Sequence, residues 1–170
     1  MKVSLIQMNS QENKAANLKK AEDLIAQAVA EDKPDMVVLP EMFTCLTESI
    51  EVRRANGETV PGGETYDLLR DLARRHHIFV HGGSLLEIDG DDVYNTTVAF
   101  DAKGNELARY RKIHLFDVTT PDGKEYRESA SISRGSEIVT YDANGARVGC
   151  TICYDLRFPE LYQALAKKDA

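Results

Sequence analysis

The chain has 170 residues, of which 42% are apolar and 29% are charged, and its formal net charge at pH 7 is −7. This size and composition predict a single globular domain with a buried core. Acidic residues outnumber basic ones by 28 to 21, which argues against nucleic-acid binding, because that function needs a basic face. No apolar run approaches the roughly 18 residues of a membrane helix, and the polar residues after Met8 do not fit a signal peptide. We therefore expect a cytoplasmic protein with neither a nucleic-acid nor a membrane partner.

The first forty residues have the pattern of a strand–helix–strand unit. A short β-type run, Lys2–Gln7, precedes apolar residues that recur at three- and four-residue steps between Leu18 and Val29, as in an amphipathic helix. Asp35–Leu39 is then a continuous apolar run with β-branched residues, which is typical of a buried strand. Together these segments predict a βαβ unit with two parallel strands.

The rest of the chain predicts a second helix followed by antiparallel strands. The turn-rich segments DGDD and DAKGN separate three strand-like runs, which indicates a meander, and DANG indicates a later hairpin. The expected segments are, in order, an irregular Phe43–Pro61, a helix from Leu68 to about His77, the strand runs Ile78–Ile88, Val93–Phe100 and Glu106–Lys112, a loop over Phe116–Gly135, and the hairpin of Glu137–Tyr141 with Ala146–Cys153.

A last helix is expected after Asp155, with Pro159 near its first position, where proline is tolerated. The chain ends inside this helix, whereas an α/β sheet normally continues with another strand. We therefore expect residues 1–170 to be the N-terminal portion of a single domain, incomplete at its C-terminus.

Cys153 stands where a nucleophile is expected. It ends the strand pattern ARVGCTIC and precedes a turn and a helix, so that its thiol is exposed beside the positive end of a helix dipole, which favours the thiolate. Other hydrolases place a serine nucleophile on a similar strand-to-helix turn. Taken alone, however, a small buried hydrophobic role is the better interpretation of this cysteine.

Cys150 and Cys153 also form a C-x-x-C pair, a spacing found in redox and zinc sites. On one strand, three steps span about 10 Å and place the side chains on opposite faces, whereas a disulfide keeps its Cα atoms within about 7 Å. No second C-x-x-C completes a zinc site. Cys150 shares a face with Val148 and Ile152 and is interpreted as core. With Cys45 the cysteines form an odd set, which fits free thiols.

Two charged residues stand where expected strands end. Glu41 follows MVVLP at the carboxyl end of a parallel strand, where catalytic groups gather in α/β sheets, although a solvated loop glutamate fits equally well. Lys112 ends the third meander strand and, by itself, is better interpreted as a snorkelling surface lysine. His114 is interpreted as structural. The spacing of the remaining histidines does not indicate a metal site; these are His76, His77 and His81.

Three segments together resemble the signature segments of the nitrilase superfamily, also called the carbon–nitrogen hydrolases, and occur in the same order. They are LPEMF at Leu39–Phe43, YRKIHLF at Tyr110–Phe116 and CYDLRFPEL at Cys153–Leu161. The stretch VYNTTVAFDAKGNELARYRK, with Tyr94 and Asn95, is similar to the central meander of that family. The resemblance runs from Met1 to Ala170. It implies a four-layer α-β-β-α sandwich, here without its C-terminal strands and helices.

The resemblance also implies a catalytic triad of Glu41, Lys112 and Cys153, with Glu128 as an additional glutamate near the site. KIHLFD, YRES and CYDLRFPEL are most similar to the ω-amidase and deaminated-glutathione-amidase branch. Enzymes of that branch act on small amides with a carboxylate, need no cofactor, and usually form dimers or larger assemblies. We therefore expect a small-molecule amide as substrate, no metal or other cofactor, and a homo-oligomer.

On this assignment each residue type has a chemical task. Glu41 takes the thiol proton of Cys153 and returns a proton to the leaving ammonia. Lys112 and the backbone N–H of Tyr154 stabilise the tetrahedral oxyanion, which collapses to a thioester that water hydrolyses. Arg157 is our hypothesis for binding the substrate carboxylate, because guanidinium matches a carboxylate with two hydrogen bonds. A surface arginine beside the helix is an equally good interpretation.

Other activities of the same superfamily stay open: a nitrilase proper, an aliphatic amidase or a carbamoyl-amide hydrolase. A hypothesis of a different class is that the chain is an inactive fragment, which acts only as a binding or association module. Core surface that the missing layers would otherwise cover would then drive the association.

Overall fold

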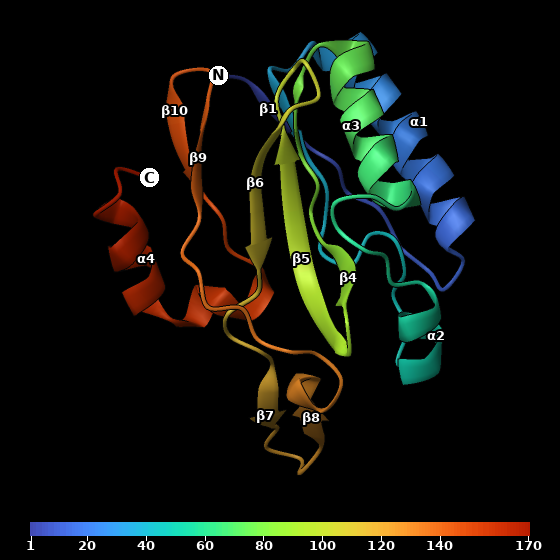
Figure 1. Ribbon diagram of the computed structural model, residues 1–170, viewed down its shortest axis with the longest axis vertical. Coiled ribbons are helices and arrows are strands. Elements are labelled where there is room, and N and C mark those ends of the chain that lie inside the picture. Colours follow the sequence, from blue (N-terminus) through green and yellow to red (C-terminus); the bar gives the residue numbers. More distant parts are fainter.

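In the computed structural model, which describes residues 1–170, one six-stranded mixed sheet separates two helices from a second, smaller β layer (Figure 1). None of the helices combines the length and the hydropathy needed to cross a membrane. The strands are β1 (Val3–Leu5), β2 (Met36–Val38), β3 (Phe79–His81), β4 (Leu85–Asp89), β5 (Asp92–Phe100), β6 (Glu106–Arg111), β7 (Asp117–Thr119), β8 (Glu125–Arg127), β9 (Thr140–Ala143) and β10 (Ala146–Gly149). The helices are α1 (Lys14–Asp32), α2 (Ile50–Ala55), α3 (Glu64–His76) and α4 (Pro159–Ala166), with 3₁₀ turns η1 (Glu128–Ala130) and η2 (Cys153–Arg157).

The main sheet begins with the predicted βαβ unit. β1 and β2 pair in parallel and α1 connects them, and β2 also pairs in parallel with β3. β5 is the central antiparallel strand, because β3 and β4 pair along it and β6 pairs with it too. The predicted meander is confirmed with one correction: the expected run Ile78–Ile88 is divided at Gly82 and Gly83 into β3 and β4.

Two cores lie on the two faces of this sheet, because successive side chains of a buried strand point to opposite faces. On β5, Val98 and Phe100 belong to the core under α1 and α3, while Ala99 belongs to the core that faces β9 and β10. α4 packs against β10, where a Cβ on Gly149 would lie 2.9 Å from Leu165. Figure 1 shows the resulting order of layers: α1 with α3, the main sheet, the β9–β10 ribbon, and α4. This α-β-β-α order confirms the fold predicted from the sequence.

Other expected segments also differ from the structure. The segment Phe43–Pro61, expected to be irregular, contains the six-residue helix α2. None of its residues is buried, so its sequence shows no apolar periodicity that would predict a helix. The segment Phe116–Gly135, expected to be a loop, contains the β7–β8 hairpin and η1. Neither strand has a buried face, so the sequence does not alternate between apolar and polar residues there. The strand expected to reach Cys153 ends at Gly149.

Candidate active site

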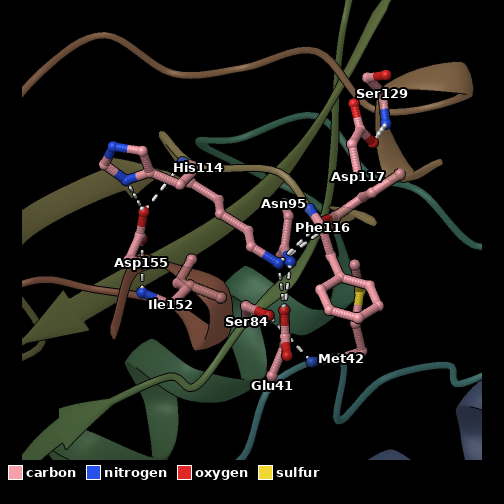
Figure 2. Close-up of polar contacts among 12 residues, drawn as sticks. Glu41, Met42, Ser84, Asn95, His114, Phe116, Asp117, Ser129, Ile152 and Asp155 are labelled. Atoms are coloured by element: carbon pink, nitrogen blue, oxygen red, sulfur yellow. Dashed lines mark hydrogen bonds and ion pairs between the residues drawn. The ribbon is translucent and has the colours of Figure 1, made fainter. Parts of the chain in front are cut away.

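Glu41 lies where the sequence predicted it, just beyond the carboxyl end of β2. The connection from β3 to β4 passes directly under it: Gly83 has φ +55°, and a Cβ there would lie 2.1 Å from the carbonyl oxygen of Pro40. Only glycine allows this approach. The next residue, Ser84, accepts a hydrogen bond from the N–H of Met42 at 3.0 Å, and Asn95 donates to Glu41 Oε1 at 2.8 Å (Figure 2). The β3–β4 connection thus fixes the backbone beside Glu41, and Asn95 of β5 holds its carboxylate.

Lys112 follows β6 and is buried, with 2% of its side chain exposed, so the interpretation as a surface lysine is wrong. Its backbone N–H donates to the carbonyl of Asn95 at 2.9 Å. Its ammonium lies 3.2 Å from Glu41 Oε1 and 2.9 Å from Glu128 Oε2. Burial alone would lower the pKa of Lys112, but the carboxylates of Glu41 and Glu128 more than offset it and raise that pKa. The lysine is thus a fixed cation.

Glu128 is the first residue of η1, directly after β8. Besides the lysine ammonium, its Oε2 accepts a hydrogen bond from the backbone N–H of Phe116 at 2.6 Å. Asp117, the next residue, accepts from the N–H of Ser129 at 3.0 Å and so closes the base of the β7–β8 hairpin (Figure 2). Glu128 therefore fastens this hairpin to Lys112.

Cys153 occupies a strained backbone position, φ +48°, at the start of η2. Non-glycine residues in this region cost about 1–3 kcal/mol and gather at functional sites. Cys153 is exposed as a residue, yet it lines the cavity that Glu41, Lys112 and Glu128 also line. Partial desolvation there, and then the charge of Glu41, raise the pKa of its thiol, although Lys112 acts in the opposite direction. The structure therefore brings the predicted triad and Glu128 together.

The turn that carries Cys153 differs from the strand-to-helix turn that would favour the thiolate. The helix α4 starts only at Pro159, and Cys153 itself begins a five-residue 3₁₀ turn. The helix dipole acts mainly within the first turn of a helix. Burial and then the carboxylate of Glu41 raise the pKa of the Cys153 thiol.

Asp155 is a site residue that sequence reasoning missed. It is fully buried, and its Oδ2 accepts hydrogen bonds from the Tyr110 hydroxyl at 2.6 Å and the Ile152 N–H at 2.9 Å. Its Oδ1 accepts from the backbone N–H of His114 at 3.0 Å and lies 2.7 Å from His114 Nδ1 (Figure 2). This single carboxylate ties the turn that carries Cys153 to the segment after Lys112. Its only sequence signal is its place within CYDLRFPEL.

The other residues singled out from the sequence lie outside the triad. Cys150 is fully buried, as predicted, and burial raises its pKa to about 12. The ring of Tyr154 packs edge-on against Phe116 at 5.1 Å between centroids. Arg157 is exposed and does not line the cavity that contains Cys153. No group of three or more histidine, cysteine or acidic residues is arranged to hold a metal ion.

The cavity beside Cys153 has a volume of about 490 Å³, which is in the usual range for small-molecule sites. Its walls come from the segment before and through α2 and from the β7–β8 hairpin, the two regions that were expected to be irregular. They supply apolar surface and further charges: Leu46, Ile50 and Tyr126, and Arg53, Glu48, Lys124, Glu125 and Arg127.

Comparisons with known proteins identify the family. A family model described as carbon–nitrogen hydrolase matches residues 2–170. The ω-amidase NIT3 of Saccharomyces cerevisiae is 37% identical over 177 residues, covering 100% of this chain and 60% of that protein. A deaminated glutathione amidase of Synechocystis is 38% identical, covering 97% and 61%. The crystal structure of yeast Nit3, described as a member of branch 10 of the nitrilase superfamily, matches with a TM-score of 0.87 and 33% identity, over 100% of this chain and 61% of that one. The chain thus spans about 60% of the length of these relatives.

Proposed function

Because the chain belongs to the carbon–nitrogen hydrolase family, we propose that the protein hydrolyses a small amide with a carboxylate to the acid and ammonia, as an ω-amidase does. The observation that carries this proposal is the buried Lys112 ammonium, held between the carboxylates of Glu41 and Glu128 on the wall that Cys153 shares. We also propose that it acts in the cytoplasm and as a homo-oligomer, as the family resemblance implies.

The first chemical step is attack by the Cys153 sulfur on the amide carbon. Because its pKa is raised, the thiol carries its proton at rest. Glu41, on the same cavity wall, accepts that proton as the sulfur attacks. The new C–S bond places a negative charge on the amide oxygen. The fixed Lys112 ammonium, together with the backbone N–H of Tyr154, stabilises this oxyanion.

Collapse of the tetrahedral intermediate breaks the C–N bond. Glu41 returns its proton to the nitrogen, so that ammonia leaves and a thioester remains on Cys153. A water molecule then attacks the thioester carbon while Glu41 takes one of its protons. The C–S bond breaks, Glu41 gives that proton to the sulfur, and the acid leaves with the thiol restored. Glu128 keeps Lys112 in place, since it contacts the ammonium with both carboxylate oxygens, at 2.9 and 3.2 Å.

The test is ammonia release by the full-length protein from a panel of short amides, nitriles and carbamoyl compounds. We expect turnover of amides with a carboxylate, and its loss in the Cys153→Ala variant. Cys150→Ala serves as the matched control, because that cysteine is fully buried in the core that faces β9 and β10. Turnover of nitriles or carbamoyl compounds alone would assign a different reaction, and amide hydrolysis that survives Cys153→Ala would overturn the mechanism.

A further inference from the structure

We propose that Arg53 forms the subsite for the substrate carboxylate. The inference rests on the proposed function and specifies it, because it names the residue that distinguishes an amide with a carboxylate from a neutral amide. It takes the place of the sequence-based hypothesis for Arg157, which is exposed and lies outside the cavity wall.

Arg53 is a half-buried cation with free hydrogen-bond donors. It lies on α2, which Ser49 caps by accepting the Val52 N–H at 3.2 Å. Its Nε donates to the carbonyl of Thr47 at 2.8 Å, which fixes the guanidinium against the loop that precedes the helix. No carboxylate lies within ion-pair distance of Arg53, so its two terminal nitrogens keep their donors for a ligand. A carboxylate matches such a pair of donors with two parallel hydrogen bonds.

The other cations of the cavity are already engaged or lie in solvent. Lys112 is held by its two carboxylates, and Arg127 pairs with Glu125 at 3.1 Å. Lys124 is exposed, with its ammonium 4.7 Å from the ring centroid of Tyr126. Arg53 is therefore the cation of this cavity that is both anchored and without a carboxylate partner.

The charges that line the cavity also favour one orientation of the substrate. Around Cys153 the carboxylates of Glu41 and Glu128 face a single ammonium, Lys112, so a negatively charged group is disfavoured there. The neutral amide suits the surroundings of Cys153. The carboxylate suits Arg53, since Glu48, the acidic residue of the neighbouring loop that also lines the cavity, is exposed and forms no ion pair with it.

Apolar side chains also line the cavity. Leu46, Ile50 and Tyr126 all line the cavity, and each is exposed in this chain, at 56%, 46% and 36%. Apolar side chains favour methylene groups over polar ones. The ligand that fits these three features is a monoamide of a short dicarboxylic acid, with a few methylene groups between the amide and the carboxylate.

The test compares succinamate with butyramide, which has a methyl group in place of the carboxylate, in full-length wild type and in the Arg53→Gln, Arg53→Lys and Arg54→Gln variants. Arg54 is the matched control, because it is the next residue of α2, is exposed and does not line the cavity. Hydrogen bonds to a charged group predict that Arg53→Gln lowers kcat/KM for succinamate roughly 10- to 100-fold, mainly through KM. Butyramide hydrolysis should stay within about twofold in every variant, and Arg53→Lys should recover part of the loss.

Equal effects of Arg53→Gln on both amides, or none on either, would overturn the subsite and leave the proposed hydrolysis intact. Binding of succinate, measured by calorimetry in the Cys153→Ala background, further separates failure of the Arg53 subsite from failure of the proposed hydrolysis. Weaker succinate binding in Cys153→Ala/Arg53→Gln than in Cys153→Ala supports the subsite even if turnover is absent. Unchanged binding excludes it.

Discussion

Replacing Lys112 by methionine tests the centre of the site, because it removes the ammonium and keeps a side chain of similar length. The variant leaves the carboxylates of Glu41 and Glu128, both of which contacted that ammonium, without a cation between them. Removing one partner of a buried ion pair costs about 3–5 kcal/mol. Since 32% of the Glu41 side chain and 13% of Glu128 are exposed, water screens part of this loss. We therefore expect a destabilisation near the low end, about 2–3 kcal/mol.

The catalytic loss should be separable from the loss of stability. Losing one oxyanion donor lowers kcat roughly 100- to 1,000-fold. The double variant Lys112→Met/Glu128→Gln removes one of the two unpaired charges, so it should recover stability relative to Lys112→Met but not activity. Urea unfolding and ammonia release measure the two quantities. Lys124→Met, on an exposed lysine that forms no ion pair with a carboxylate, should change the free energy of unfolding by less than about 0.5 kcal/mol. A double variant that regains activity together with stability would show that Lys112 only supports the fold.

Three further predictions concern Asp155, His81 and Glu41. Asp155→Asn should destabilise the protein by about 2–4 kcal/mol in urea unfolding, because an amide NH₂ cannot accept the two hydrogen bonds from His114. Burial lowers the pKa of His81 from 6.5 to about 4. Between these two pH values the unfolded state therefore binds more protons than the folded state. The contribution of His81 to the free energy of unfolding is complete above pH 6.5 and is lost as the pH falls toward 4. As His81 keeps some exposure, His81→Gln should remove about 1–2 kcal/mol of the difference in unfolding free energy between pH 7.5 and pH 5; an unchanged difference would refute this. Glu41→Gln should lower the pKa of Cys153, so that iodoacetamide labels it faster at pH 7 while turnover falls roughly 100-fold or more; slower labelling would contradict the electrostatics.

Much of the fold could be predicted because its signals are local. The βαβ unit follows from continuous apolar runs and one amphipathic helix, and the strand ends place Glu41 and Lys112 at one region of the sheet. The resemblance of three ordered segments then indicated that these residues and Cys153 belong to one site. Single residues considered alone did not indicate this site. A lysine at a strand end is usually at the surface, and only the tertiary fold shows that Lys112 is buried between two carboxylates.

The parts that could not be predicted depend on contacts between distant segments. Asp155 accepts hydrogen bonds from residues more than forty positions earlier, and no periodic pattern in the sequence predicts such contacts. Arg53 belongs to a helix of six residues without a buried face, which carries no apolar pattern. The thiol of Cys153 was expected to be activated by a helix dipole, but the local turn is a 3₁₀ turn and Glu41 dominates its charge environment.

The most direct test of the mechanism is mass spectrometry of the full-length protein quenched during turnover of succinamate and digested to peptides. The account predicts a succinyl thioester on the peptide that contains Cys153, and its absence from the Cys153→Ala variant. Cys45 provides an internal comparison, because it lines the same cavity but is buried, and burial followed by the charge of Glu12 raises the pKa of its thiol. A thioester on Cys45 or Cys150, with none on Cys153, would contradict the assignment of the nucleophile.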